Sequence, residues 1–220
     1  MPRKEQTLRN TTTGASTEAA IRTMSNDDNL VHERRQFIAG RALPLFVRQG
    51  FNRTSVREIS QACDMSIGAV YHYLGSKDDI GLLVAEQMRR EMIEFMNHAF
   101  EDPRPVESLR SSIAEWCRLC DRLKDNVLFL YREPRNIKEA VQKRIAEVDE
   151  QCISMFDKVL TMGVEAGVFK IANTRLFALN VYVLGNMWAF GRWYVGKFMT
   201  LDEYIEFQTD ALLSSALNRR

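Results

Sequence analysis

Three serines close together in the chain are spaced to hydrogen-bond the free N–H groups at the starts of helices. Ser55 is followed by Glu58 and Ser76 by Asp79, each three residues later, and Ser66 stands before a short apolar run. A serine hydroxyl at such a position accepts from a backbone N–H, and the acidic side chain accepts from the serine's own N–H. The spacing therefore predicts three helix starts within a short segment.

The middle element of this segment, residues 67–73, is too short to form a stable helix by itself in water. Apolar neighbours such as Val56, Ile59 and Val70 must therefore hold it in place. A short helix held at a fixed angle, with small and polar residues at its start, suits insertion into the major groove of DNA. We expect this element to contact DNA.

The first residues of this short helix are predicted to face the phosphate backbone or the base edges. Ser66, Ile67 and Gly68 carry its free N–H groups, which lie at the positive end of the helix dipole. Ile67 can also make an apolar contact to a thymine methyl group. Thr54 and Ser55 are expected first as caps, and a phosphate contact is compatible with that role.

The segment resembles the N-terminal domain of the TetR family of transcriptional regulators, over roughly residues 34–85. The residues that carry the resemblance are Phe46, Gly50, Phe51, Thr54, Ser55, Ile59, Ser66, Gly68, Tyr71, His72, Tyr73, Ser76, Lys77 and Ile80. The resemblance implies that Tyr71 and His72 contact DNA, with Tyr71 reaching a phosphate. It also implies a phosphate contact for Lys77 and a core position for Tyr73.

Four residues depart from the pattern of the family. Asp64 replaces the usual glycine of the turn, where aspartate is among the few residues that tolerate a left-handed backbone. Leu74 replaces a phenylalanine, and Ile67 stands where a lysine or arginine is common. Pro44 lies inside the expected first helix, where we predict a kink because proline removes one hydrogen bond and clashes with the carbonyl of Gly40.

The net charge of the 220-residue chain is +1, so a DNA-binding surface has to come from the placement of cations. Arg57 is the arginine that we assign to this surface. The alternative is that many basic residues of the segment are ordinary solvated charges. The available cations are Arg34, Arg35, Arg41, Arg48, Arg53, Arg57 and Lys77.

The apolar spacing beyond this segment is helical throughout, and no convincing strand alternation is present. We expect an all-α chain with a disordered extension at 1–30, a three-helix helix-turn-helix domain at 31–76, and a larger helical domain for ligand binding and dimerisation at 77–220. Arg3, Lys4 and Arg9 keep open the alternative of a DNA-contacting N-terminal arm. Asn173 or Thr174, and Thr200 with Glu203, predict the starts of the last two helices.

No apolar run is long enough to cross a membrane and no signal peptide is evident, so we expect a cytoplasmic protein. No motif of a catalytic site, a phosphate loop or a metal centre appears, which argues against an enzyme and against a cofactor or metal. Cys117 and Cys120 have C-x-x-C spacing. They lie on an apolar helical stripe, however, where buried packing is favoured over redox chemistry.

Methionine and aromatic residues on these helices predict an adaptable apolar pocket, and a Tyr–Arg segment near Pro134 is expected to orient a polar or anionic ligand head. The alternatives are plain core for some of the apolar residues and an exposed turn for the polar segment. The candidate ligand-binding residues are Met92, Phe95, Met96, Trp116, Tyr131, Arg132, Arg135, Phe156, Met187, Trp188 and Arg192.

The segment from Phe177 to Tyr194 alternates small residues with large aromatics and resembles the family's dimer-forming bundle, in which two helices come from each chain. Residues 188–194 are also similar to members that sense acyl-CoA thioesters. The candidate dimer residues are Tyr182, Gly185, Ala189, Trp193, Tyr204, Gln208 and Leu212.

Together these features predict a ligand-responsive regulator, a repressor first, that binds a palindromic DNA operator as a homodimer. The expected effector is apolar, such as an acyl-CoA or aromatic-CoA. Cationic drugs are the alternative effector, with Glu115, Glu133 and Asp157 as candidate partners. The alternative function is a helical small-molecule-binding or adaptor protein that has lost DNA binding.

Overall fold

The computed structural model describes residues 28–98, 102–132 and 139–217 of the chain. Within these ranges all regular structure is α-helical, apart from one isolated bridge between Phe169 and Leu217, so the predicted all-α class is confirmed. The helices are α1 (Asp28–Gln49), α2 (Val56–Ala62), α3 (Ile67–Tyr73), α4 (Asp78–His98), α5 (Pro105–Arg122), α6 (Lys124–Arg132), α7 (Glu139–Glu165), α8 (Thr174–Val195) and α9 (Leu201–Ala216).

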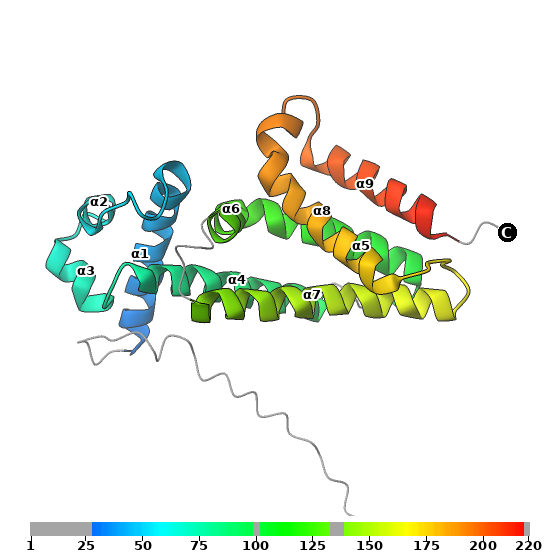
Figure 1. Cartoon of the computed structure of the whole chain (residues 1–220), viewed down its shortest axis with the longest axis horizontal. Helices are drawn as coiled ribbons and strands as arrows, with labels where there is room; N and C mark the ends of the chain where they lie inside the picture. The colour runs from blue at the N-terminus through cyan, green and yellow to red at the C-terminus, as the bar shows by residue number, and fades with distance from the viewer. Residues whose placement is uncertain (1–27, 99–101, 133–138, 218–220) are drawn as a thin grey trace, which may run out of the picture.

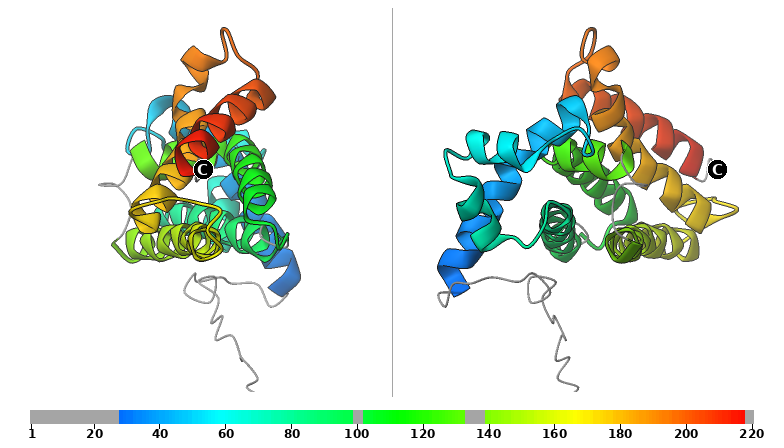
Figure 2. Two further views of the ribbon diagram at one scale, coloured as in Figure 1. Left: turned by 90° about the vertical axis from the view of Figure 1, so that its right-hand side faces the viewer. Right: turned by 60° about the vertical axis from the view of Figure 1, so that its left-hand side comes forward.

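The helices form an N-terminal domain, α1 to α3, and a C-terminal domain, α4 to α9 (Figure 1). Helix α4 runs from the first domain into the second and packs beside α7. Helix α8 lies across α5 and α7, and α9 packs on α5. The second view of Figure 2 shows α2 and α3 on the opposite side of the molecule from α9. None of the helices in the described ranges is long and apolar enough to cross a membrane.

Local capping fixes the two short helices of the N-terminal domain, as the serine spacing predicts. The N–H of Glu58 donates to Ser55 Oγ at 3.2 Å, and the N–H of Ser55 donates to Glu58 Oε2 at 2.8 Å, which completes a capping box for α2. Helix α3 begins with the N–H of Ala69 donating to Ser66 Oγ at 3.1 Å. Between these two helices Asp64 has a φ of 54°, the left-handed conformation expected at this turn.

The third predicted cap forms only in part. The N–H of Ser76 donates to Asp79 Oδ2 at 2.9 Å, but Ser76 Oγ is buried without a hydrogen-bond partner. Helix α1 continues through Pro44 and begins at Asp28, inside the predicted N-terminal extension. The proposed DNA-contacting arm with Arg3, Lys4 and Arg9 lies outside the described residues, as does Arg135.

A cluster of three phenylalanines joins the two domains. The ring of Phe129, on α6, lies 5.2 Å from that of Phe46 on α1 and 6.0 Å from that of Phe51, which follows α1. All three side chains are buried. Aromatic pairs at these separations stabilise the fold beyond what their buried area contributes. Since Phe129 moves with α6, a movement of α6 disturbs the packing of the N-terminal domain.

A second aromatic cluster fills the C-terminal domain. The ring of Trp116 lies 5.5 Å from that of Phe95 and 5.0 Å from that of Tyr182, and its N–H donates to the carbonyl of Tyr182 at 2.9 Å. This close approach requires glycine at position 185, since a Cβ built there would lie 2.3 Å from Trp116 Nε1. Tight packing of α8 on α5 therefore depends on this one small residue.

Candidate DNA interface and effector site

Helix α3 presents an exposed face that the protein itself does not cover. Ile67 and Tyr71 are 44% and 49% exposed, Ser66 and Gly68 are also exposed, and His72 is half-buried. A Cβ added at Gly68 would meet only Ser66 Oγ, at 3.9 Å, so the fold does not demand glycine at this position. The face carries hydroxyl groups that can bind phosphates, and its small residues Ser66 and Gly68 allow the backbone to approach DNA closely.

The opposite side of α3 anchors the helix to α1. Val70 is buried, and Tyr73 packs against the core as the sequence predicts. Arg35 Nε donates to the carbonyl of Tyr73 at 3.0 Å, and the Tyr73 ring meets His72 edge to face with 4.9 Å between centroids. Arg35 is itself buried, so this arginine holds α3, the recognition helix expected to contact DNA, and does not present its charge to DNA.

The assignment of Thr54 to DNA contact is wrong for its side chain. Thr54 is 1% exposed; its hydroxyl donates to the carbonyl of Gly50 at 2.9 Å and accepts from Gln49 Nε2 at 3.2 Å. Both hydrogen bonds lie inside the turn that leads to α2, so the buried hydroxyl is not available to a phosphate. Ser55 and Arg57 are exposed and keep their places on the surface.

Glu58 makes the beginning of α2 a fixed negative site. The N–H of Ser55, the amide of Gln49 and the hydroxyl of Ser55 all donate to its carboxylate, and they lower the pKa of Glu58 to about 2. The carboxylate is therefore ionised at neutral pH and well below it.

Lys77 is held by the N-terminal domain. Its Nζ donates to the carbonyls of Phe51 and Thr54 at 2.7 and 2.9 Å, and it lies 4.4 Å from the centroid of the Phe51 ring. An ammonium group has three N–H bonds, so one is left for a phosphate. Lys77 thus connects the beginning of α4 to the turn between α1 and α2.

The predicted ligand-binding residues fall into two groups. Met92, Phe95, Trp116, Phe156 and Trp188 are buried in the C-terminal core, with Met96 half-buried beside them. Met187 does not belong to this set, because it is 51% exposed on the opposite side of α8. The apolar spacing of α8 is ambiguous since both of its faces carry large apolar residues.

The predicted cations lie at the edge of the domain, and Arg192 and a further arginine at the groove, Arg175, are paired with acids. Arg192 lies 3.2 Å from Asp121, which also accepts from the indole N–H of Trp188 at 2.8 Å. Arg175 lies 3.5 Å from Glu150, and Arg132 is exposed at the end of α6. An anionic head group would have to compete with these carboxylates.

Three polar side chains from three helices meet beside the aromatic core. The hydroxyls of Tyr131 on α6 and Tyr182 on α8 lie 2.9 and 2.6 Å from the two oxygens of Asp149 on α7, and 2.7 Å from each other. We call this arrangement the polar triangle. Burial raises the pKa of Asp149, although both phenols hydrogen-bond it. Burial is also the main cause that raises the pKa of Tyr131 and Tyr182.

Asp149 is the functional candidate that sequence analysis missed. It lies on the core-facing stripe of α7, between Ile145 and Cys152, where helical spacing calls for an apolar residue. A charged residue at a core position was the available signal. Tyr131 was assigned to the ligand site, whereas Tyr182 was assigned to the dimer interface.

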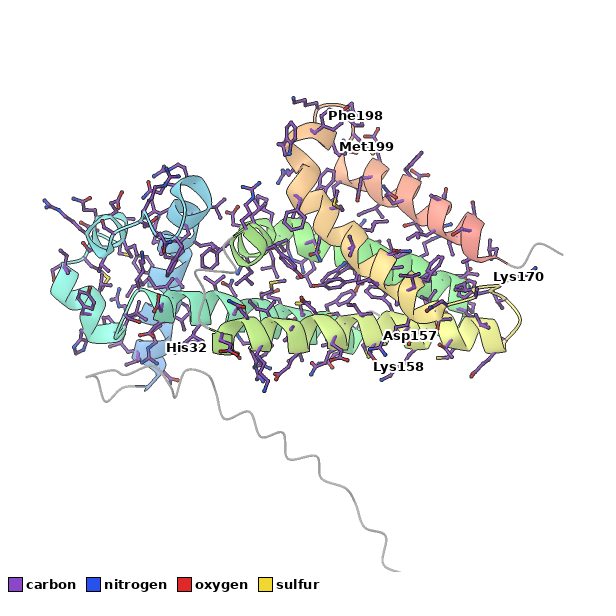
Figure 3. All side chains as sticks on the ribbon, viewed as in Figure 1. His32, Asp157, Lys158, Lys170, Phe198 and Met199 are labelled. Atoms are coloured by element: carbon purple, nitrogen blue, oxygen red, sulfur yellow. The ribbon has the colours of Figure 1, made fainter. Side chains whose placement is uncertain are left out.

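An open groove of about 1180 Å³ reaches Asp149 from the surface, between the end of α4, α7 and the beginning of α8. Figure 3 labels Asp157 and Lys158 on the α7 wall of this groove. Inside, Asp149 also borders a small void of about 10 Å³ together with Met88 and Met92. The polar triangle therefore lies between a solvent-filled groove and the apolar core.

Four of the seven predicted dimer residues are buried within the single chain: Tyr182, Gly185, Ala189 and Tyr204. They cannot form a surface for a second copy, because this side of α8 packs on α5 of its own chain. Gln208 and Leu212 are half-buried, and Trp193 is 71% exposed. The small residues were thus assigned to the wrong contact.

The other side of α8 is an exposed apolar stripe, which we call the outer face of α8. It includes Val183 and Met187, at 43% and 51% exposure, and it continues to Phe198 at the turn before α9 (Figure 3). Phe207 on α9 is 64% exposed and borders a groove together with Phe198. The stripe comprises Leu176, Leu179, Val183, Met187, Tyr194 and Phe198.

All four cysteines are buried thiols, as the sequence predicts for the C-x-x-C pair. Burial raises the pKa of Cys117 to about 12. Such a thiol stays protonated and packs as a small apolar side chain. Among the described residues no group of histidine, cysteine and acidic side chains is arranged to hold a metal ion.

Two family models match the chain. Residues 38–82 match the model of bacterial regulatory proteins of the tetR family, and residues 102–214 match the tetracyclin repressor-like C-terminal domain. The first match contains α2, α3 and the beginning of α4, and the second contains α5 to α8 and most of α9.

Relatives and solved structures agree with these matches. The HTH-type transcriptional regulator HbdR of Aromatoleum sp. strain CIB is 27% identical over 199 residues, which cover 87% of this chain and 84% of HbdR. A tetR-family regulatory protein from Rhodococcus RHA1 has a TM-score of 0.76 at 20% identity and covers 84% of this chain and 98% of its own.

AibR in complex with isovaleryl coenzyme A and operator DNA has a TM-score of 0.73 at 17% identity, over 82% of this chain and 98% of that one. At this identity the likeness shows the fold. Taken with the two family models, which together span both domains, it leads to one conclusion. The chain belongs to the TetR family of transcriptional regulators.

Proposed function

We propose that the protein is a repressor that binds a palindromic operator as a homodimer and leaves it when an apolar CoA thioester occupies the C-terminal domain. The exposed face of α3 carries the DNA half of this proposal. Ile67, Gly68 and Tyr71 are exposed there, on a helix that caps and packing hold at a fixed angle. The phenol of Tyr71 positions a phosphate, and Ile67 contacts a thymine methyl group.

The outer face of α8 supports the homodimer. A contiguous apolar stripe of this kind is uncommon on a monomeric protein and is typical of an interface. A two-fold axis through it pairs α8 and α9 with their copies, while α3 lies far from this face (Figure 2). The two recognition helices can then enter successive major grooves, about 34–36 Å apart.

The aromatic core and the groove beside it, which Met96 and Asp149 line, support an apolar effector with a polar head. Met92, Phe95 and Trp116 would contact the acyl or aryl group, and methionine adapts readily to a ligand's shape. AibR, whose fold is similar, binds isovaleryl coenzyme A. The thioester class is therefore the first effector to test.

Helix α6 provides a route from the effector to the DNA. Tyr131, near its end, belongs to the polar triangle, and Phe129, two residues earlier, packs on Phe46 and Phe51. Lys77 links the same part of the N-terminal domain to the beginning of α4. An effector that moves α6 thus changes the angle of the recognition helices, which bind two half-sites at once only in one arrangement.

The test is to select operator fragments from random DNA with the full-length protein and to measure binding at several salt concentrations. We expect a palindromic site whose affinity falls steeply with salt, and a loss of binding in Tyr71→Ala with the dimer intact. A panel of CoA thioesters and a panel of cationic dyes are then titrated into the complex. Release by dyes alone would overturn the effector class, and failure to bind any two-fold site would favour the adaptor function.

A further inference from the structure

The polar triangle holds more contacts than its hydroxyl protons can supply. Its three oxygen–oxygen separations, 2.9, 2.7 and 2.6 Å, are all hydrogen-bond distances. Each such contact needs one proton. Tyr131 and Tyr182 bring one proton each, and an ionised carboxylate brings none. With Asp149 ionised, one of the three contacts would join two oxygens without a proton between them.

A neutral carboxyl removes this deficit. The proton of Asp149 then completes a ring in which each of the three groups donates once and accepts once. We propose that Asp149 is a neutral carboxyl that closes a three-proton triangle with Tyr131 and Tyr182, and that this triangle binds the carbonyl oxygen of the effector through Tyr131. The second half of this inference rests on the proposed effector response; the first half does not.

The charged groups around the triangle do not neutralise Asp149. On α4, the guanidinium of Arg89 is hydrogen-bonded to Glu86. On α7, Arg144 pairs with Glu147, and Glu150 is engaged by Arg175 of α8.

The remaining neighbours are thiols and one arginine at the surface. Cys120 on α5 and Cys152 on α7 are buried, and burial raises the pKa of both. On α6, Arg132 is exposed. The hydrogen bonds to Asp149 come from the two phenols, and the direction of its pKa shift agrees with the proton count.

Tyr131 is the more exposed of the two phenols in the triangle. It is 37% exposed, whereas Tyr182 is 4% exposed. A thioester carbonyl accepts a hydrogen bond but donates none. It therefore accepts the hydrogen bond that the Tyr131 hydroxyl otherwise donates within the triangle. Tyr131 then loses the hydrogen bond that it donates to Asp149 on α7, and α6 becomes free to move with Phe129. A cationic ligand would instead favour loss of the proton from Asp149, and its binding would strengthen as the pH rises.

The protonation of Asp149 is tested without any effector. The infrared difference spectrum at neutral pH between the full-length protein and Asp149→Asn should show the carbonyl band of a protonated carboxyl, present only in the parent. In Tyr131→Phe the band should shift, because the carboxyl loses a partner. Absence of the band in the parent overturns the neutral triangle.

The ligand half is tested by release from the selected operator with isovaleryl-CoA, benzoyl-CoA and stearoyl-CoA. In Tyr131→Phe the effective thioester should need about three- to tenfold more, the worth of one hydrogen bond. The matched control is Tyr204→Phe, which loses a hydroxyl bonded to the carbonyl of Leu184 at 2.8 Å, away from the triangle. The anchoring role is overturned if both variants lose the same amount of thioester potency, or if Tyr131→Phe loses none.

The two failures are distinguishable. If no thioester releases the parent protein, the proposed effector class and the anchoring role fall together, while the infrared band still decides the state of Asp149. If a thioester releases the parent but its potency rises with pH, the effector does not need the neutral triangle, and the inference alone is wrong.

Discussion

The two domains use a carboxyl group in opposite ways. In the N-terminal domain, Glu58 lies at the surface and is held ionised by the N–H and hydroxyl groups around it. In the C-terminal domain, Asp149 lies in a largely apolar environment with two phenols, and burial works against its charge. The first arrangement stabilises one conformation of a short helix. The second is a network whose partners a ligand can exchange, so it suits a switch.

The difference extends to how each domain is held together. The capping box that begins α2 joins residues three positions apart, Ser55 and Glu58. The polar triangle instead joins residues 18, 33 and 51 positions apart. Local caps begin the two short helices, and packing on α1 together with Arg35 holds α3, so this domain can keep its shape while the domain behind it rearranges. This is the division of work that a ligand-responsive DNA-binding protein needs.

The largest expected effect is the loss of the proposed dimer when a charge is placed on the outer face of α8. Met187→Glu should convert the dimer to a monomer, because an unpaired charge buried in an interface costs about 3–5 kcal/mol and the two-fold axis brings it in twice. Sedimentation and operator titration measure this. The control is Met162→Glu on α7, equally exposed at 56% but outside the stripe. Dimers that persist in Met187→Glu would move the interface elsewhere.

The second effect compares one glycine from each domain. Gly185→Ala should lower the free energy of unfolding by about 2 kcal/mol, since the new Cβ would overlap Trp116. Gly68→Ala should leave stability within about 1 kcal/mol, because its Cβ would make only an ordinary contact with Ser66 Oγ, and should weaken operator binding at the proposed DNA face. Urea unfolding and operator titration of both variants separate the outcomes. Weaker stability in Gly68→Ala than in Gly185→Ala would reverse the comparison.

These positions show how far the sequence could predict the structure. The left-handed Asp64, the Ser55–Glu58 box and the Thr200–Glu203 box depend on neighbours within a few residues, and all three were predicted. The role of Gly185 depends on which helix lies opposite, and helical spacing alone does not tell α5 of the same chain from a second α8. Asp149 was missed for the same reason, since its partners are distant in sequence.

Lys77 gives a third and smaller effect, which decides whether the link between the domains also contacts DNA. Lys77→Met should destabilise the N-terminal domain by about 1.5 kcal/mol, because a charged group loses its bonds to the carbonyls of Phe51 and Thr54. If its third N–H binds a phosphate, the slope of log affinity against log salt should also fall by about 0.9. An unchanged slope with lower stability would make Lys77 purely structural.

The smallest effect is a difference in how the two carboxyls respond to pH. The pKa of Asp149 is raised above the ordinary value of about 3.9, so its contribution to stability is fully present below that pH. It is lost as the pH rises through the pKa of the folded protein. Asp149→Asn, which stays neutral, should therefore gain stability relative to the parent with rising pH, by about 1.4 kcal/mol for each unit of the shift.

Glu58 has the opposite sign. Its pKa is lowered to about 2, so its contribution is present above the ordinary value of about 4.3 and is lost as the pH falls toward 2. Glu58→Gln should flatten the acid side of the stability curve, while Asp149→Asn flattens the side above about pH 4. Urea unfolding of the parent and both variants across this range measures the two slopes. Parallel curves for Asp149→Asn and the parent would mean that folding does not raise the pKa of Asp149, and both domains would then hold an ionised carboxylate at neutral pH.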